Sequence, residues 1–577
     1  MNIFNLLKQD VLNAASKLTQ NAAELANIVI EMPRDSLNGD LSTNAAMLLA
    51  SSLKRPPRDI AMELKEALQT LPYIAHIEIA GPGFINFIIH AAFWQKTLSN
   101  ILTQGLSYGT SNVGNGKKIN VEYVSANPTG PMHIGHARGA VYGDALARLL
   151  IKCGFDVTKE YYINDAGAQI TVLAESAFLR YQEYCTGEKA HIPEGMYPGE
   201  YLCLVGENLA EKYGKQLLGM KAEEYLPLIR PFAVEEMLEL IKRDLLQLGI
   251  EHDVFTSEQK LHDEGKIEKA IATVEDLGLL YEGTLPIPKG KAQDNWEERS
   301  QLLFKSTAYG DDQDRALKKA DGSWTYLAGD LAYTADKIER GFDSLILVLG
   351  ADHGGYVKRM EAITKALSGG KVESDIKICQ MVNYVENGSP VKMSKRAGSF
   401  STVRDVVLEV GGDIIRFMML TRKNDAVLDF DLVKVKEQSK DNPVFYVQYA
   451  YVRSKSILAN AKEKLPESSK MLDENNIDLT LLSSEEEIRL IKLLAAWPKI
   501  VELAAIHFEP HRIALYLQSV ASTFHSLWNL GKENNDYRFV IEDNKDLTAA
   551  RLALVSAMGY VIHSGFDIIG IEVLEKM

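Results

Sequence analysis

Two histidines at the start of a predicted helix carry the most specific chemistry in this sequence. His133 and His136 are three residues apart, with Gly135 between them. The alternating pattern of 118–124 predicts a strand, and the apolar spacing of 133–153 predicts the helix that follows. The free N–H groups and positive dipole of a helix N-terminus attract phosphate. The two imidazoles could stabilise the α-phosphate of ATP during its transfer, and Gly135 would leave room for the nucleotide. Two ordinary surface histidines are the alternative.

A lysine pair further along the chain could complete a nucleotide site. Residues 392–396 read Lys-Met-Ser-Lys-Arg and follow a predicted strand and a polar turn. Lys392 and Lys395 could act as point charges on the β- and γ-phosphates and stabilise departing pyrophosphate. We expect Met393 and Ser394 to contact the same nucleotide. A solvated basic loop explains the segment equally well when it is considered alone.

A third segment is expected at the same edge of the sheet. The apolar run 345–349 predicts a buried parallel strand, and it ends in Gly350, with Asp352 and His353 close behind. Ligands of open α/β sheets bind at the carboxyl ends of the strands. These residues could therefore contact the ribose of ATP or the amino group of a second substrate. A polar loop after a core strand explains either side chain singly just as well.

Composition limits the possible classes of protein. The length of 577 residues predicts several domains, and 46% hydrophobic with 24% charged residues is typical of a globular chain. Four scattered cysteines without a C-x-x-C pattern indicate no structural zinc, and we expect no protein-bound metal. No apolar run suggests a membrane span, and no targeting pattern is evident, so we expect a cytoplasmic protein. A net charge of −15 argues against nonspecific nucleic-acid binding.

Taken together, the histidine and lysine motifs resemble the two signatures of class I aminoacyl-tRNA synthetases. Four segments are similar to arginyl-tRNA synthetases in particular: 122–136, 162–170, 326–330 and 441–450. The resemblance covers nearly the whole chain. The motif region consists of Ala126, Asn127, Pro128, Thr129, Gly130, Pro131, Met132, His133, Ile134, Gly135 and His136. One departure is His353-Gly354, where close relatives carry paired histidines.

The resemblance implies the substrates and the residues that bind them. Its substrates would be L-arginine, ATP with Mg²⁺ and tRNA(Arg), and we expect a monomer. In the family, residues matching Glu122, Tyr326 and Asp330 surround the substrate guanidinium, and those matching Ser125 and Asn127 hold its backbone end. A guanidinium is a planar, always charged donor that requires carboxylates around it. Tyr326 and Asp330 would share one helix face, although a helix-surface pair without a ligand would show the same spacing.

The expected architecture has three parts. Residues 1–112 form an N-terminal α+β module that contacts tRNA in the family. Residues 113–425 form an α/β Rossmann-type catalytic domain with a mostly helical insertion at about 160–320. Residues 426–577 form an all-α anticodon-binding domain, in which the aromatic and basic residues of 446–455 could contact single-stranded RNA.

Three other functions remain open at this stage. The first is a class I synthetase for another amino acid, which a pocket containing both Glu122 and Asp330 argues against. The second is a nucleotidyltransferase that shares the histidine motif, although such folds are usually compact. The third is a non-catalytic tRNA-binding relative, which retention of both histidines and both lysines makes a weaker explanation.

Overall fold

The computed structural model describes residues 2–33, 35–285, 300–319, 321–390, 402–437, 442–474 and 476–576. The chain divides into two compact units. One comprises residues 1–111, 439–568 and 572–577, and the other comprises residues 112–438 and 569–571. The predicted lysine loop, with Lys392, Met393, Ser394 and Lys395, lies outside the described residues.

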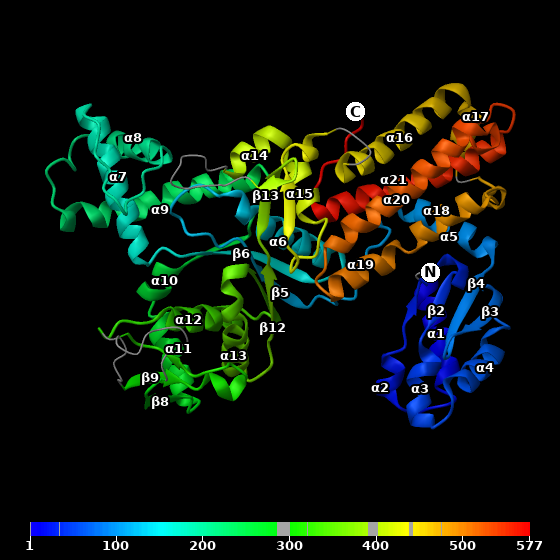
Figure 1. Ribbon diagram of the computed structural model, residues 1–577, viewed down its shortest axis with the longest axis horizontal. Coiled ribbons are helices and arrows are strands. Elements are labelled where there is room, and N and C mark those ends of the chain that lie inside the picture. Colours follow the sequence, from blue (N-terminus) through cyan, green and yellow to red (C-terminus); the bar gives the residue numbers. More distant parts are fainter. Residues whose placement is uncertain are drawn as a thin grey trace. The chain divides into compact units, whose positions relative to one another are not determined.

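A five-stranded parallel sheet forms the centre of the 112–438 unit. In sheet order its strands are β12 (Glu373–Cys379), β11 (Ser344–Gly350), β5 (Lys118–Glu122), β6 (Asp156–Ile163) and β7 (Val254–Ser257). The first of these along the chain, β5, is the middle strand (Figure 1). The next strands along the chain, β6 and β7, lie on one side of β5, and the later strands β11 and β12 lie on the other side. The carboxyl ends of β5 and β11 therefore form a topological switch point, where ligands of such sheets bind.

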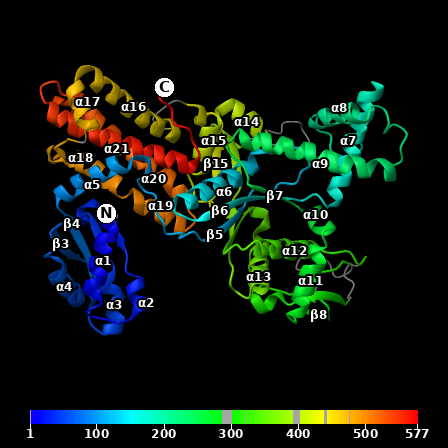
Figure 2. The same cartoon turned by 180° about the vertical axis from the view of Figure 1, so that it is seen from behind.

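Helix α6 (Ile134–Lys152) positions the predicted phosphate site. It begins one residue after His133, as the sequence predicts, and packs against β5, β6 and β11 (Figure 2). Gly143 makes this close packing possible, because a Cβ added there would lie 2.2 Å from Cγ of Tyr123. Helix α6 therefore packs tightly against the end of β5, the strand that precedes it in the chain.

A second group of elements in this unit surrounds α12 (Tyr326–Glu339). This helix shares an apolar core with α11 (Lys266–Asp276) and α13 (Val357–Ser368). The remaining elements of this group are α10 (Glu258–Asp263), β8 (Leu280–Gly283), β9 (Gln301–Phe304), β10 (Arg315–Ala316) and η5 (Ala351–Tyr356). Strands β8 to β10 form an antiparallel sheet. The prediction of a mostly helical insertion at about 160–320 did not include this sheet.

Three helices of the predicted insertion pack around a core of their own. They are α7 (Ala168–Thr186), α8 (Tyr201–Tyr213) and α9 (Ala222–Leu246). A small sheet and two helices complete the unit: β13 (Val382–Glu386), β14 (Ser389–Pro390), β15 (Leu428–Asp431), α14 (Val403–Val410) and α15 (Gly412–Met419). Thr402 and Asp405 form a capping box at the start of α14.

The other unit begins with an antiparallel sheet of order β1-β2-β4-β3. Its strands and helices are β1 (Ile30–Glu31), β2 (Leu41–Thr43), β3 (Ile74–Ala80), β4 (Phe84–Ile89), α1 (Ile3–Ala15), α2 (Ala22–Ala26), α3 (Ala45–Leu53), α4 (Pro57–Leu68) and α5 (Ala91–Gln104). Strands β3 and β4 form a hairpin around residues 81–83, since they pair directly across it.

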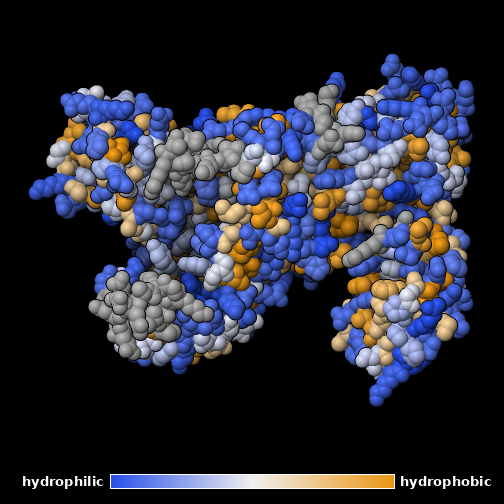
Figure 3. Space-filling model, viewed as in Figure 1, coloured by the Kyte–Doolittle hydropathy of each residue, from blue (hydrophilic) through white to orange (hydrophobic). Residues whose placement is uncertain are grey.

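The C-terminal part of the same unit is helical. Its helices are α16 (Pro443–Lys464), α17 (Pro466–Asp473), α18 (Glu485–Ala495), α19 (Trp497–Ile506), α20 (His511–Glu533) and α21 (Lys545–Ile569). Within the described residues, α21 is the one helix long and apolar enough to cross a membrane, but most of its residues are buried in the bundle. Such burial is typical of a core helix. The visible molecular surface is largely hydrophilic, with apolar residues in separate patches (Figure 3).

Candidate active site at the carboxyl edge of the parallel sheet

The two histidine rings lie together at the N-terminus of α6. Their centroids are 3.6 Å apart and their planes differ by 23°. The backbone N–H of His133 donates to Nδ1 of His136 over 3.3 Å. Gly135 is required by this arrangement, because a Cβ added there would lie 2.9 Å from the His133 ring. Both imidazoles are partly exposed at the positive end of the helix, where an anionic group can approach them.

The backbone that enters this motif is strained. Val124 and Ser125 have φ values of 70° and 39°, in the left-handed region that non-glycine residues avoid. Ser125 is held by its Oγ, which donates to Glu122 over 3.1 Å and accepts the N–H of Tyr162 over 3.0 Å. Such strain persists only where the surroundings determine the conformation, and it is common at functional sites.

Two tyrosines hold the rest of the motif loop. The hydroxyl of Tyr161 on β6 donates to the carbonyl of Ala126, and that of Tyr201 on α8 donates to the carbonyl of Thr129, each over 2.7 Å. Asn127, between these anchors, is exposed. The loop is therefore fixed by the sheet and by the insertion, with the Asn127 side chain free to meet a ligand.

Asp330 carries a buried carboxylate oxygen without a protein partner. None of the described residues donates a hydrogen bond to its Oδ2. Burial raises the pKa of Asp330 to about 7; the positive charge of Arg359 opposes this rise, and the charges of Glu122 and Glu258 add to it. Buried acceptors are nearly always paired. An unpaired carboxylate oxygen therefore suits a cationic hydrogen-bond donor that arrives as a ligand.

Glu122, the last residue of β5, is paired within the protein. Its Oε2 accepts from Nζ of Lys337 over 2.5 Å, and both side chains are buried. The Lys337 ammonium also lies 4.0 Å from the centroid of the Tyr333 ring. The sequence assigned Glu122 to the pocket but did not predict Lys337, which neutralises it and holds it in place.

A third carboxylate was missed by the sequence analysis. Glu258, the first residue of α10, is 9% exposed, and its Oε1 would lie 3.5 Å from a Cβ added to Gly329, the neighbour of Asp330. Burial and then the charge of Asp165 raise the pKa of Glu258 to about 7, while a hydrogen bond from Tyr162 lowers it. Asp165 itself lies in the segment 162–170, but no local pattern distinguishes Glu258.

The remaining predicted residues lie at exposed positions. Tyr326, the first residue of α12, is 66% exposed and lies one helical turn from Asp330, as predicted. Gly350 is the last residue of β11. Asp352 and His353 follow it, and 3.5 Å separates Oδ2 of Asp352 from Nε2 of His353. The side chains of Tyr326, Asp352 and His353 are therefore accessible to a ligand. Within the described ranges, no three His, Cys, Asp or Glu side chains form a group that could hold a metal ion.

The first residues described after the lysine segment contact the histidine motif. Thr402, the first of these residues, forms an isolated antiparallel bridge with His133. The N–H of Val403 donates to the carbonyl of Met132 over 2.8 Å. Thr402 and Val403 are thus held beside the histidine pair.

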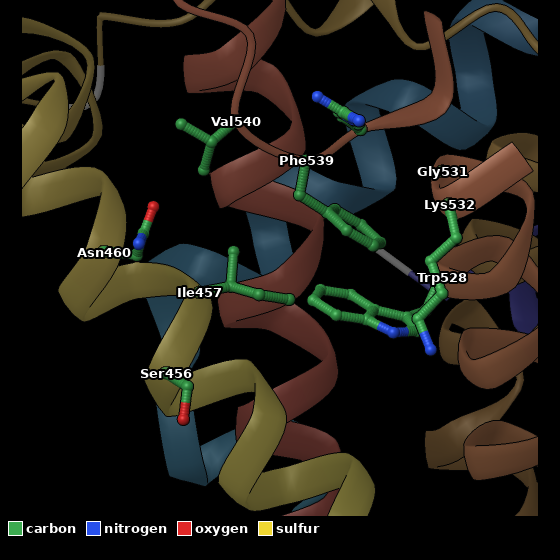
Figure 4. Close-up of a pocket in the computed structure, with 9 residues that line it drawn as sticks. Ser456, Ile457, Asn460, Trp528, Gly531, Lys532, Phe539 and Val540 are labelled. Carbon is green, nitrogen blue, oxygen red and sulfur yellow. The ribbon is translucent and has the colours of Figure 1, made fainter. Parts of the chain in front are cut away.

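The helical C-terminal part contains a separate pocket of about 490 Å³ (Figure 4). It is lined by Ser456, Ile457, Asn460, Trp528, Gly531, Lys532, Arg538, Phe539 and Val540. The rings of Trp528 and Phe539 are stacked with centroids 6.1 Å apart, and the Arg453 guanidinium lies 4.5 Å from the Trp528 ring. Tyr451, which belongs to the run 446–455 predicted to contact RNA, is a buried core residue.

The parallel sheet with its switch point, the histidine pair at the start of α6 and the helical C-terminal part define a class I aminoacyl-tRNA synthetase, an enzyme of the ligase class. Three family models match the chain: "Arginyl tRNA synthetase N terminal domain" over residues 5–89, "tRNA synthetases class I (R), catalytic domain" over 97–197, and "DALR anticodon binding domain" over 447–577.

Full-length relatives narrow the class to one family. The chain is 61% identical to the arginine–tRNA ligases of Rickettsia canadensis (strain McKiel) and Rickettsia prowazekii (strain Madrid E), with 100% of each chain covered. The chain belongs to the arginyl-tRNA synthetase family. A Campylobacter jejuni structure described as an arginyl-tRNA synthetase matches 85% of this chain and all of its own length at 32% identity, with a TM-score of 0.72. The Thermus thermophilus enzyme shares the fold over both full lengths, with a TM-score of 0.71 at 19% identity.

Proposed function

We propose that this chain activates L-arginine with ATP, as its magnesium complex, and transfers it to the 3′-terminal ribose of tRNA(Arg). The unpartnered, buried Oδ2 of Asp330 carries the proposal. A guanidinium supplies the cationic donors that this oxygen lacks within the protein. Family membership and the 61% identity to arginine–tRNA ligases support the same substrates.

In the first step, the arginine carboxylate attacks the α-phosphorus of ATP and pyrophosphate leaves. His133 and His136 stabilise the charge that develops on the α-phosphate, and Lys392 and Lys395 stabilise the pyrophosphate. No enzyme nucleophile is needed, because catalysis consists of positioning and charge stabilisation. The stacked rings at the α6 N-terminus support this role for the histidines.

The nucleotide also needs contacts along its ribose and base. Gly135, Gly350, Asp352 and His353 serve this purpose at the carboxyl ends of β5 and β11, and Met393 and Ser394 contribute from the lysine segment. The exposed side chains of Asp352 and His353 support this assignment. In the second step, the ribose hydroxyl of tRNA attacks the arginyl carbonyl and AMP departs.

The amino acid lies in the carboxylate pocket. Asp330, Glu122 and Tyr326 surround the guanidinium, while Ser125 and Asn127 hold the backbone end of arginine. The pocket supports this arrangement electrostatically, because Lys337 pairs with Glu122 while the Oδ2 of Asp330 has no donor among the described residues. An acidic amino acid would be repelled, and a neutral one would leave the carboxylates unpaired.

Apart from its 3′ end, the tRNA binds outside this pocket. Residues 1–112 and 426–577 are proposed as the tRNA-contacting module and the anticodon-binding domain, on either side of a catalytic domain at 113–425. The aromatic and basic lining around Trp528 supports RNA contact in the helical part, since bases stack on aromatic rings and cations attract phosphate. We further propose a cytoplasmic monomer without a membrane-bound state or structural zinc.

The test is aminoacylation of purified tRNA with each of the twenty amino acids in turn. We expect arginine alone to be transferred. Charging with a different amino acid would assign the chain to another specificity, and an absence of charging with all twenty would contradict the proposed activity.

A further inference from the structure

Helix α9 carries a charged residue on its buried face. Asp244 is 1% exposed and lies among the buried side chains of Ile241, Leu245 and Leu248. A position on that face of an amphipathic helix normally holds an apolar residue. Burying a carboxylate is costly unless a partner compensates it, and no role proposed above uses Asp244.

The partner of Asp244 is the backbone in front of the histidine motif. Its Oδ2 accepts the N–H of Met132 over 3.2 Å, and the carbonyl of Met132 accepts the N–H of Val403. Burial raises the pKa of Asp244 to about 6; the Met132 N–H, Arg404 and Arg243 oppose the rise, and Asp405 adds to it. The residue before His133 is therefore held through both of its backbone polar groups.

The end of α9 is itself fixed to α6. Nη1 of Arg416 donates to the carbonyl of Leu248 over 2.7 Å, and its Nη2 contacts the Asp144 carboxylate over 2.6 Å. Asp144 is a buried residue of α6. At the start of α15, a Cβ added to Gly412 would lie 2.7 Å from the carbonyl oxygen of Gln247, so these segments are in close contact. Through these contacts the end of α9, which carries Asp244, is held in a fixed position relative to the histidine helix α6.

We propose that Asp244 is a positioning residue for the phosphate site. By accepting the Met132 N–H it fixes the chain that enters α6, and with it the orientation of His133 and His136 toward the α-phosphate. This inference rests on the proposed function. It predicts an effect on the rate of adenylate formation without an effect on arginine binding, because Asp244 makes no contact with Asp330 or Glu122 among the described contacts.

Two substitutions separate the hydrogen bond from packing and charge. Asp244→Leu removes the acceptor but suits the apolar face, so the fold is expected to be retained. Asp244→Asn keeps an acceptor oxygen and removes the charge. Glu235→Leu, at an exposed position of the same helix, is the matched control.

The assay is arginine-dependent ATP–pyrophosphate exchange in the presence of cognate tRNA. A displacement of reacting groups by about 1 Å costs up to about 100-fold in rate, and we expect Asp244→Leu to lower kcat by about 10- to 100-fold. The arginine KM should stay at the parent value. Asp244→Asn and Glu235→Leu should retain most of the parent kcat.

Three outcomes would overturn the role. They are parental kcat in Asp244→Leu, an arginine KM that rises as steeply as kcat falls, and an equal loss in Asp244→Asn. If thermal melting shows that Asp244→Leu does not fold, Asp244→Ser tests the same contact, because serine is small and too short to reach the Met132 N–H. An inactive parent would instead contradict the proposed function, and this separates the two failures.

Discussion

Replacing Asp330 by asparagine tests the carboxylate pocket most directly. The substitution keeps the size of the side chain and removes the charge of a group whose Oδ2 is buried and accepts no hydrogen bond from the residues that the structure describes. Losing one partner of a buried charged pair costs about 3–5 kcal/mol. At 1.36 kcal/mol per factor of ten, this corresponds to an increase of about 100- to 5,000-fold in the arginine KM. We expect the lower end, because Glu122 and Glu258 remain nearby.

The pH dependence gives a second, independent signature. The pKa of Asp330 is raised to about 7 in the ligand-free pocket, but a guanidinium requires the ionised carboxylate. The ionised fraction of a group with that pKa rises about tenfold between pH 6 and pH 8. The arginine KM of the parent should therefore fall by up to about tenfold over this range. In Asp330→Asn this step should be smaller, and the part that remains should come from Glu258, whose pKa is also raised to about 7.

Steady-state ATP–pyrophosphate exchange with cognate tRNA, measured against arginine and ATP from pH 6 to pH 8, provides both values. The ATP KM should stay close to that of the parent. Glu339→Gln is the control, since Glu339 lies on the same helix in an exposed ion pair with Lys269. Equal arginine KM values in parent and Asp330→Asn, or an unchanged pH step in the variant, would refute the reasoning.

Three further predictions concern the phosphate site and tRNA. His136→Ala should slow adenylate formation by about 100- to 1,000-fold, the usual effect of losing one donor aimed at developing charge, with little change in arginine binding; near-normal adenylate formation would exclude the role. Exchange should require tRNA(Arg), because bound tRNA is expected to shift the population toward a pocket that is competent around Asn127 and Tyr326; substantial exchange without tRNA would contradict this coupling. Trp528→Ala should raise the tRNA KM by the equivalent of about 1–3 kcal/mol, the value of one stacked base, and leave the arginine and ATP KM values unchanged; an unaltered tRNA KM would remove this pocket from the RNA surface.

The sequence by itself determined the features that depend on local pattern. The strand at β5, the helix start at His133 and the buried strand β11 all match the structure. Each depends on side-chain periodicity, turn residues or a helix N-terminus, which are properties of neighbouring residues. The family resemblance indicated the class from these features, and it is supported by the matching family models and by the full-length arginine–tRNA ligases that are 61% identical to this chain.

The tertiary structure decided which charged side chains lie close to one another. Lys337 compensates Glu122, and Glu258 adds to the electrostatics around Asp330, although these residues lie far apart along the chain. The same holds for Asp244, which the sequence analysis did not single out and whose partner is the Met132 N–H, far away along the chain. Burial is the main cause of the raised pKa of Asp330, and within the described part of the chain its Oδ2 has no donor. Desolvation and pairing depend on the summed environment of a side chain in space, and linear spacing carries no record of that environment.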